Sequence, residues 1–376
     1  MKVNNRNGFI EFCRFVFALC VVSHHSIFFE GHGHIPFIGG YIACEFFFIL
    51  SGFLMAGSIS KEENSEESSV LFAVKKIKKI YPYFFVAWIT SFIIYHFING
   101  SLQISNVLID LLRGLPQLFL LSMAGLSGGN LGFYDYVGTG WYSSAYLISI
   151  LVLYPIMKKC KKIDFWCGSI APLVTLIGYG YIGYHYGFMG VVNERIPIAY
   201  LGCVRALAGI SLGCFCYFLV VQCKKYKTTV AGKHIFGGIQ LLLLVISLLL
   251  MEKYEGFNDI IQLFVFATLI VVTFGFDTYV NELFKNKLSY SLGQFSMVIF
   301  VTQSLAYMYP ILKYPTDWKM YYITHFIYIF IFSLMNYFIV QAFLFFTKKI
   351  SIRNLLKKEN DTNGKEIEVR DENNRA

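Results

Sequence analysis

Charged residues are scarce in this chain. Asp, Glu, Lys and Arg make up 15% of its 376 residues, whereas hydrophobic residues make up 56%. Soluble globular domains carry about 25% charged residues, so the composition excludes an ordinary soluble domain and indicates a polytopic membrane protein. The 38 Phe and 26 Tyr fit helices packed in lipid with aromatic side chains at the membrane–water interfaces.

The sequence also lacks paired cysteines. Its nine cysteines stand singly in apolar stretches or beside lysines, with no CxxC pair and no Cys/His set at metal-ligand spacing. We therefore expect reduced packing residues, no disulfide framework and no metal site. A cleaved signal peptide is not expected either, because Arg14 interrupts the first apolar run and no small-residue cleavage site follows it.

Long apolar runs are what the chain has in abundance. Ten runs are long enough to cross a hydrocarbon core of about 30 Å, and they predict an all-α polytopic integral membrane protein with about ten transmembrane helices. They fall at 9–29, 37–58, 80–99, 141–157, 168–186, 198–222, 234–251, 258–275, 289–311 and 321–346. A further run at 103–123 carries Asp110, Arg113 and Pro116, which predicts an amphipathic segment that is interfacial or re-entrant.

Positive charges are divided unequally between the two sides of these helices. Of the 32 Lys and Arg, 25 fall in segments that would face one side and 5 in segments that would face the other. The positive-inside rule places both termini in the cytoplasm, and it accounts for most of the net charge of +9 without a nucleic-acid partner. We expect one transmembrane domain over 1–349, without internal repeats, followed by a disordered, charged cytoplasmic tail over 350–376.

The first helix carries ionisable residues in an otherwise apolar stretch, "EFCRFVFALCVVSHHSIFF". Such side chains cost a few kcal/mol in hydrocarbon, so each needs a partner or a function. Eleven residues return to within about 20° of a whole number of helical turns, so Arg14 and His25 share a face and lie about 16 Å apart along the axis. His24 points about 100° away from that face, and Glu11 is placed to pair with Arg14.

Two interpretations of this helix are open at this point. In the first, Glu11 neutralises Arg14 and the histidines only cap the helix at the outer interface. In the second, Arg14 and His25 mark a polar path through the bundle. Arginine offers forked donors that suit phosphate or carboxylate, and histidine titrates near neutrality and can act as a base.

Two motifs carry a resemblance to a known family. The stretch "IEFCRFVFALCVVSHH" resembles the opening of the membrane acyltransferases of acyltransferase family three, bacterial sugar O-acyltransferases whose first helix has an Arg, ten residues and then a His. The stretch "GGYIACEFFFILSGFLMAG" is similar to their second-helix signature of an acid, aromatic residues and Ser-Gly-Phe. The residues that match this signature are Glu45, Phe47, Phe48, Ser51, Gly52 and Phe53. Ser51 and Gly52 also permit close helix packing, and Glu45 can equally form an ion pair with Arg14 or His25.

The stretch "VKKIKKIYPYFFVAW" resembles the basic segment and proline that open the third helix of the family. Its lysines are Lys75, Lys76, Lys78 and Lys79. They are either topology determinants in contact with membrane lipid headgroups or phosphate contacts for a nucleotide-bearing donor. Pro82 suits the first turn of a helix.

Later matches are looser. Trp141 and Ser144 fit an aromatic and serine motif of the family, although Tyr146 stands where many members have Glu. Gln303 stands where a His is common, and its amide can hydrogen-bond a sugar hydroxyl but cannot relay a proton. Arg205 fits a sixth-helix pattern and can pair with an acid in the bundle or meet a donor phosphate.

The resemblance covers residues 8 to about 345. It implies O-acylation of a sugar hydroxyl, usually acetylation of a cell-surface or exported polysaccharide or a lipid-linked glycan. It further implies a location in the bacterial inner or plasma membrane, cytosolic acetyl-coenzyme A (acetyl-CoA) as the acyl donor, and no permanently bound cofactor. The competing interpretation is a proton-coupled transporter or flippase of a glycan or small polar substrate, which would favour an inverted repeat that this sequence does not have.

The resemblance and the chemistry of the side chains together assign expected roles. His25 is the expected base for the acceptor hydroxyl, with Glu45 expected to orient its ring. The residues expected to bind the donor are Arg14, Lys75, Lys76, Lys78, Lys79 and Arg205. The residues expected to bind substrate are Ser51, Trp141, Ser144 and Gln303. A covalent acyl-enzyme on His25 or Ser51 remains an open alternative.

Overall fold

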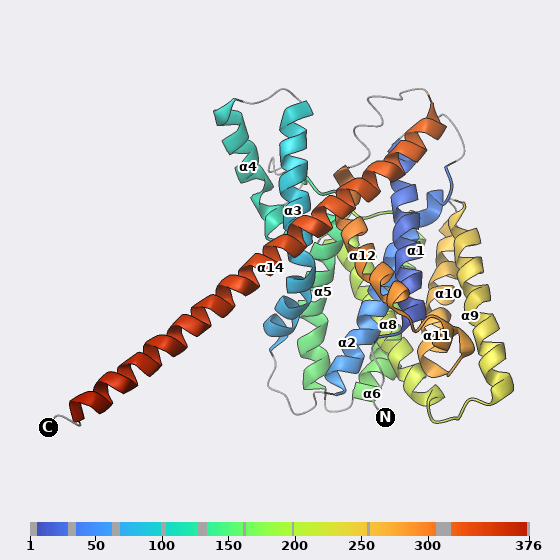
Figure 1. Cartoon of the computed structure of the whole chain (residues 1–376). Helices are drawn as coiled ribbons and strands as arrows, with labels where there is room; N and C mark the ends of the chain where they lie inside the picture. The colour runs from blue at the N-terminus through green and yellow to red at the C-terminus, as the bar shows by residue number, and fades with distance from the viewer. Residues whose placement is uncertain are drawn as a thin grey trace.

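The computed structural model describes residues 6–28, 35–61, 68–98, 103–126, 134–160, 163–197, 199–253, 256–305 and 317–373. Nearly all of them are helical (Figure 1). The α-helices are α1 (Gly8–His24), α2 (Ala43–Ile59), α3 (Ser69–Ile98), α4 (Ile104–Leu118), α5 (Gly140–Lys159), α6 (Ile163–Phe165), α7 (Ala171–Tyr186), α8 (Leu201–Cys223), α9 (Val230–Met251), α10 (Gly256–Gly275), α11 (Tyr279–Leu283), α12 (Lys287–Thr302) and α14 (Trp318–Asn373).

Short elements link these helices. They are the 3-10 turns η1 (His25–Phe28), η2 (Ile38–Ile42) and η5 (Gln303–Leu305), the π-turns η3 (Ser122–Leu126) and η4 (Trp166–Ile170), and the strands β1 (Arg195–Ile196) and β2 (Ala199–Tyr200). The two strands pair antiparallel just before α8 begins. They form the only sheet in the described part of the chain.

Eight helices within the described residues are long and apolar enough to cross a membrane. They coincide with eight of the ten predicted segments, which confirms an all-α polytopic membrane protein. The other two segments are α1, of 17 residues, and α12, of 16 residues. Each of these is prolonged by a 3-10 turn, η1 and η5, and both pass through the bundle beside the longer helices (Figure 1).

The centre of the bundle is the contact between α2 and α8. The span that includes α2 is 78% buried, whereas α14 is 22% buried and α9 is 28% buried over their spans. Glycine allows this close approach, because a Cβ added at Gly52 would lie 1.9 Å from the carbonyl oxygen of Ile210. The expectation that Ser51 and Gly52 permit close packing is met at Gly52.

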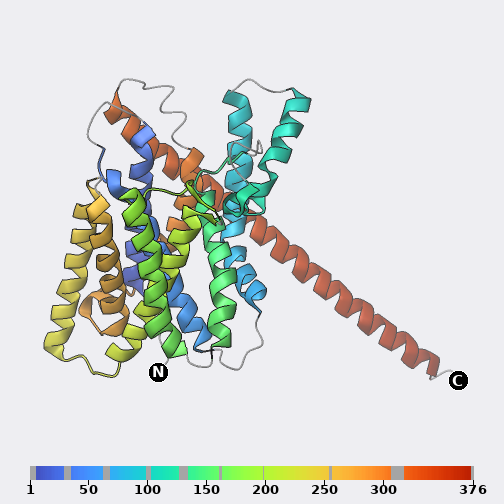
Figure 2. The same cartoon turned by 180° about the vertical axis from the view of Figure 1, so that it is seen from behind.

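The predicted amphipathic segment forms α4, which is not among the eight spanning helices. In both views α4 lies beside the far part of α3, and it runs back toward the middle of the bundle (Figure 2). The chain then turns at Leu120, whose φ is 57°. This course is that of a re-entrant segment, one of the two predicted possibilities.

Helix α3 begins earlier than the sequence indicates. It starts at Ser69, so the four lysines lie on its first turns and Pro82 lies inside the helix instead of at its start. Proline within a helix removes one backbone hydrogen bond, which neighbouring helices in a membrane bundle tolerate.

The charged tail expected over 350–376 follows the apolar part of α14. Helix α14 is continuous to Asn373 and leaves the bundle obliquely (Figure 1). The few apolar residues in 350–376 argue against a packed core, but they do not prevent a helix from propagating out of α14, since extension needs no new nucleus. The apolar span of α14 itself ends at Thr347, close to the expected limit of the domain.

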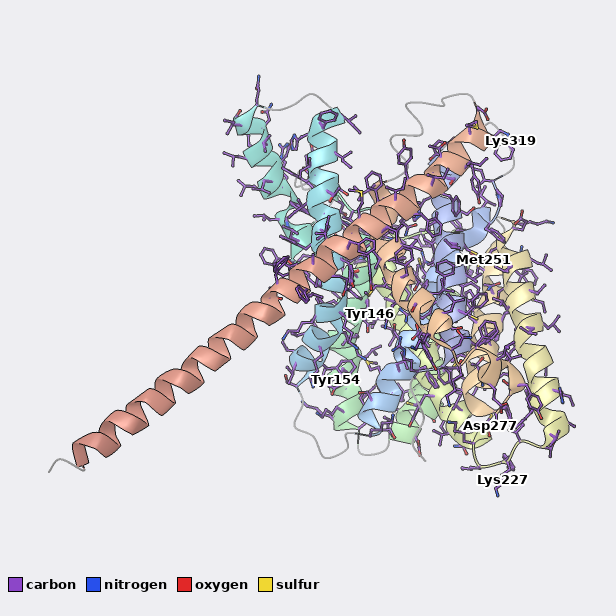
Figure 3. All side chains as sticks on the ribbon, viewed as in Figure 1. Tyr146, Tyr154, Lys227, Met251, Asp277 and Lys319 are labelled. Carbon is purple, nitrogen blue, oxygen red and sulfur yellow. The ribbon has the colours of Figure 1, made fainter. Side chains whose placement is uncertain are left out.

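The two ends of the bundle carry different charges. Lys227 and Asp277 lie at one end and Lys319 lies at the other (Figure 3). We call the end with Lys227 the basic end, because Lys61, Lys158, Lys224 and Lys285 lie in its connections as well. The basic end is the one expected to face the cytoplasm.

Cysteine labelling tests this orientation. An impermeant maleimide added to intact cells should label Lys319→Cys, and it should label Lys227→Cys only after the membrane is permeabilised. The native cysteines give little background, because seven are buried and Cys160 and Cys223, which are half-buried, belong to the basic end. Labelling of Lys227→Cys in sealed cells would reverse the predicted topology.

Candidate functional site

A buried ion pair joins α2 to α8 near the end opposite the basic end. Nε of Arg205 lies 2.6 Å from Oε1 of Glu45, and the two side chains are 1% and 0% exposed. The hydroxyl of Tyr179 on α7 donates to Oε2 of Glu45. Trp141 covers the pair, with its ring centroid 5.2 Å from the guanidinium carbon of Arg205. Both oxygens of Glu45 are thus engaged by fixed donors.

Arg205 was expected either to pair with an acid in the bundle or to meet a donor phosphate. In the structure it pairs with Glu45, and it does not line the inner pocket that holds Arg14, Lys76 and Lys79 described below. Glu45 likewise holds Arg205 and Tyr179, and its expected contact with the His25 ring is replaced by these two. The physical reason is that a fully buried carboxylate is tolerated only beside a cation and hydrogen-bond donors.

The ring of His25 is held by Gln303 instead. Nδ1 of His25 lies 3.0 Å from Oε1 of Gln303, and Nε2 of Gln303 donates to the carbonyl oxygen of Phe300 at 2.9 Å. The second bond fixes the orientation of the amide, because only its NH₂ group can donate to a carbonyl. Nδ1 of a neutral His25 therefore carries the proton, and Nε2 is the basic nitrogen.

His24 has different neighbours, as the helical phase predicts. Its Nδ1 lies 2.6 Å from the carbonyl oxygen of Ile38, and its ring packs edge-on against Tyr41 at 5.2 Å. The hydroxyl of Tyr41 contacts both carboxylate oxygens of Asp259, at 2.7 and 2.8 Å. Asp259 also accepts a hydrogen bond from the backbone N–H of Met189 at 2.7 Å. His24 thus belongs to a packing network with η2 and α10.

A pocket of about 270 Å³ opens among α1, α2, α3, α5 and α12. Its three cations are Arg14, Lys76 and Lys79, which lie on the early turns of α1 and α3 that start at the basic end. The rest of the lining is mostly apolar or aromatic: Phe47, Leu50, Leu54, Ile80, Tyr142, Tyr146, Met297, Phe300 and Val301, with Ser51, Ser143 and Ser296 between them. We call this space the inner pocket.

The inner pocket gathers several of the predicted site residues. Arg14 keeps the expected partner, since its Nη1 lies 2.8 Å from Oε2 of Glu11. Arg14 lines the pocket together with Ser296 of α12, and His25 contacts Gln303 of η5, which directly follows α12, so both residues lie on the side of α1 that faces this part of the chain, as predicted. Ser51 lines the pocket, and its hydroxyl donates to the carbonyl of Phe47 at 2.7 Å.

Other predicted residues lie outside this pocket. Lys76 and Lys79 line the inner pocket, whereas Lys75 and Lys78 do not. The side chains of Lys75 and Lys78 are exposed on α3. Ser144 is fully buried, and its Oγ accepts the backbone N–H of Met123 at 2.8 Å, so it anchors η3. The serine that lines the pocket at this turn of α5 is Ser143.

Three residues of this region were missed from the sequence. Asp259 could have been found, because it is an acid in an apolar helix. Tyr41 and Tyr179 gave no signal, since they are two of 26 tyrosines and only the fold shows which carboxylates they meet.

The buried pair gives a prediction for stability. Arg205→Leu leaves Glu45 buried without its cation, so we expect a loss of about 3–5 kcal/mol in the free energy of unfolding. Adding Glu45→Gln to this variant should recover part of the loss. Lys233→Met is the control, because the Lys233–Glu282 pair lies at the surface, where water screens an ion pair so that it adds little to stability. Thermal unfolding in detergent measures all three, and equal effects of Arg205→Leu and Lys233→Met would contradict the assignment.

Comparison with known proteins supports one family. The model of the acyltransferase family three domain, described as an acyltransferase domain, matches residues 7–347. No match was found among curated proteins or among solved structures. The match covers nearly all of the helical bundle, and it supports the acyltransferase interpretation over the transporter interpretation. The chain therefore belongs to acyltransferase family three and is a multi-pass membrane acyltransferase.

Proposed function

We propose that this acyltransferase moves an acetyl group from cytosolic acetyl-CoA to a hydroxyl group of a cell-surface or exported glycan, in the cell membrane. The observation that carries the proposal is that Gln303, which holds His25, donates a hydrogen bond to Phe300, and Phe300 lines an inner pocket with cations toward the basic end. A cationic mouth suits the phosphates of the donor, and an apolar interior suits the pantetheine arm and the acyl group.

Donor binding follows from this division of the pocket. Arg14 offers a planar fork of donors to a phosphate or a pantetheine carbonyl, and Lys76 and Lys79 add two point charges. The aromatic and aliphatic lining beyond them excludes water from the thioester. An extended pantetheine arm covers the roughly 16 Å between Arg14 and His25 along α1. The acetyl carbonyl then reaches the outer half of the bundle.

The reaction needs two proton transfers, one from the acceptor hydroxyl to His25 and one from His25 to the leaving thiolate. Nε2 of His25 takes the proton from the acceptor hydroxyl, whose oxygen forms a bond to the acetyl carbonyl carbon. The C–S bond of the thioester then breaks, and the thiolate of coenzyme A receives the proton from the imidazolium of His25. Gln303 is the group that holds Nδ1–H and so keeps the ring in the required tautomer. Direct transfer of this kind needs no covalent acyl-enzyme.

Substitution of the two adjacent histidines tests the base. His25→Ala should lower the transfer rate by about 10²–10⁴-fold, the usual effect of losing a general base, while the protein still inserts and folds. His24→Ala should keep substantial activity, because its ring contacts Ile38 and Tyr41 and not Gln303. The assay is transfer of radiolabel from acetyl-CoA to polysaccharide in isolated membranes. An essential His24 beside a dispensable His25 would place the base elsewhere.

Substitution of Arg14 tests the donor site. Arg14→Lys keeps the charge but loses the planar fork, so we expect most activity to disappear and the KM for acetyl-CoA to rise. Lys78→Ala is the matched control, since this lysine is exposed on α3 outside the pocket, and it should leave the KM unchanged. A normal KM and turnover in Arg14→Lys would remove Arg14 from the donor site.

A further inference from the structure

A second pocket lies beyond His25, toward the end opposite the basic end. Its volume is about 210 Å³, and we call it the outer pocket. It is lined by three residues of α3, three residues of the segment that leads into α5, and two residues of η5. They are Ser91, Ile94 and Tyr95, then Tyr134, Asp135 and Tyr136, then Ser304 and Leu305.

The two pockets share two elements of the bundle. Ser296 to Val301 of α12 line the inner pocket, and Ser304 and Leu305 of η5 line the outer pocket. Gln303, which holds His25, lies between these two stretches. Helix α3 likewise lines the inner pocket at Ile80 and the outer pocket at Ser91, about 16 Å farther along its axis. Gln303, the residue that holds the proposed base, thus lies between the stretches that line the two pockets.

The outer pocket has an aromatic wall. The ring of Tyr95 lies 5.6 Å from that of Tyr136 and 6.4 Å from that of Tyr134. Trp88 supports this wall from behind, at 5.5 Å from the ring of Tyr136. Tyr134 is 41% exposed at the rim, and the guanidinium carbon of Arg113 lies 5.5 Å from the centroid of its ring. Flat aromatic faces pack well against the C–H faces of a sugar ring.

Polar groups complete the wall. The carboxylate of Asp135 accepts a hydrogen bond from Ser122 at 3.0 Å, and the exposed side chain of Asp135 lines the pocket. The hydroxyl of Ser91 is buried and has no hydrogen-bond partner among the described residues. A buried hydroxyl without a partner is costly unless a ligand or water satisfies it, so it indicates a polar ligand in this pocket.

We propose that the outer pocket binds one sugar ring of the acceptor and presents its hydroxyl group to His25. The C–H face of the ring lies on Tyr134 and Tyr95, and its hydroxyls bond to Asp135 and Ser91. The volume is below the roughly 300–1,000 Å³ of sites for drug-sized ligands, so it fits a single ring with the rest of the glycan outside. This assignment rests on the proposed function, since it names the acceptor site for that reaction.

The test separates acceptor binding from donor binding. The acceptor is envelope polysaccharide from the organism that carries the chain, treated with mild alkali so that its hydroxyls are free. The variants are Tyr134→Ala and Asp135→Asn, with Tyr134→Phe to restore the ring face. Exposed matched controls outside the pocket are Tyr184→Ala, at a side chain that is 86% exposed, and Asp164→Asn. Radiolabelled acetyl-CoA gives the KM for each substrate and the slow hydrolysis of donor without acceptor.

We expect a selective effect on the acceptor. Tyr134→Ala and Asp135→Asn should raise the KM for polysaccharide by about tenfold, and they should leave the KM for acetyl-CoA and the donor hydrolysis unchanged. Tyr134→Phe and both controls should behave like the wild type. An unchanged KM for polysaccharide, or a parallel rise for both substrates, would overturn the acceptor site and leave the proposed function standing. Absence of transfer by the wild type would overturn the proposed function and the acceptor site with it.

Discussion

The buried pair of Glu45 and Arg205 is the interaction on which the rest of the arrangement depends. Neither charge reaches solvent, so each is tolerable only because the other is 2.6 Å away and Tyr179 adds a hydrogen bond. The pair joins the two most central helices, α2 and α8, and brings in α7 through Tyr179. The packing around it is tight, because a Cβ added at Gly209 would lie 2.8 Å from the hydroxyl of Tyr179 and 3.1 Å from Oε2 of Glu45.

This pair also positions the end of α1. Helix α2 begins next to η2, whose Ile38 carbonyl contacts His24, and whose Tyr41 reaches Asp259 on α10. The contacts of His24 therefore depend on the same framework that Glu45 and Arg205 hold together. With His24 held on one side, the next residue, His25, faces α12 and meets Gln303. The orientation of the His25 ring thus depends on His24, whose own contacts are packing contacts.

Much of the fold follows from composition and periodicity. The hydrophobic runs predict the spanning helices, because a helix in lipid must be apolar over about 20 residues whatever its neighbours are. Helical phase also predicts the Arg14–Glu11 pair and the different surroundings of His24 and His25, since both depend only on local geometry. The start of α3 was missed, because polar residues at the end of a helix do not exclude helical structure.

The partners of the site residues could not be predicted in the same way. Gln303 lies 278 residues from His25, and Arg205 lies 160 residues from Glu45. Nothing in the local sequence says which of several buried polar groups will meet. Glu45 is as suitable as Gln303 to orient an imidazole by its chemistry alone, and only the packing of α2 against α8 assigns it to Arg205. Ser143 and Ser144 could not be distinguished from the sequence either. They are adjacent on α5 and point in different directions, and only the packing of α5 shows that Ser143 lines the pocket while Ser144 bonds to Met123.

The alignment of α1 with α12 suits a reaction in which donor and acceptor come from opposite sides of the membrane. Both helices run from the basic end toward the opposite end. Arg14 lines the inner pocket together with Ser296 of α12, and His25 contacts Gln303 of η5, which directly follows α12. The proposed donor site and the proposed base therefore lie at different depths along these two helices. The outer pocket comes next in this direction, because two residues of η5 line it. In the proposed reaction, a donor that enters from one side and an acceptor that enters from the other meet at His25, where the contact of Nδ1 with Gln303 leaves Nε2 as the base. The mostly apolar lining of the inner pocket beyond its cations would then keep water away from the thioester.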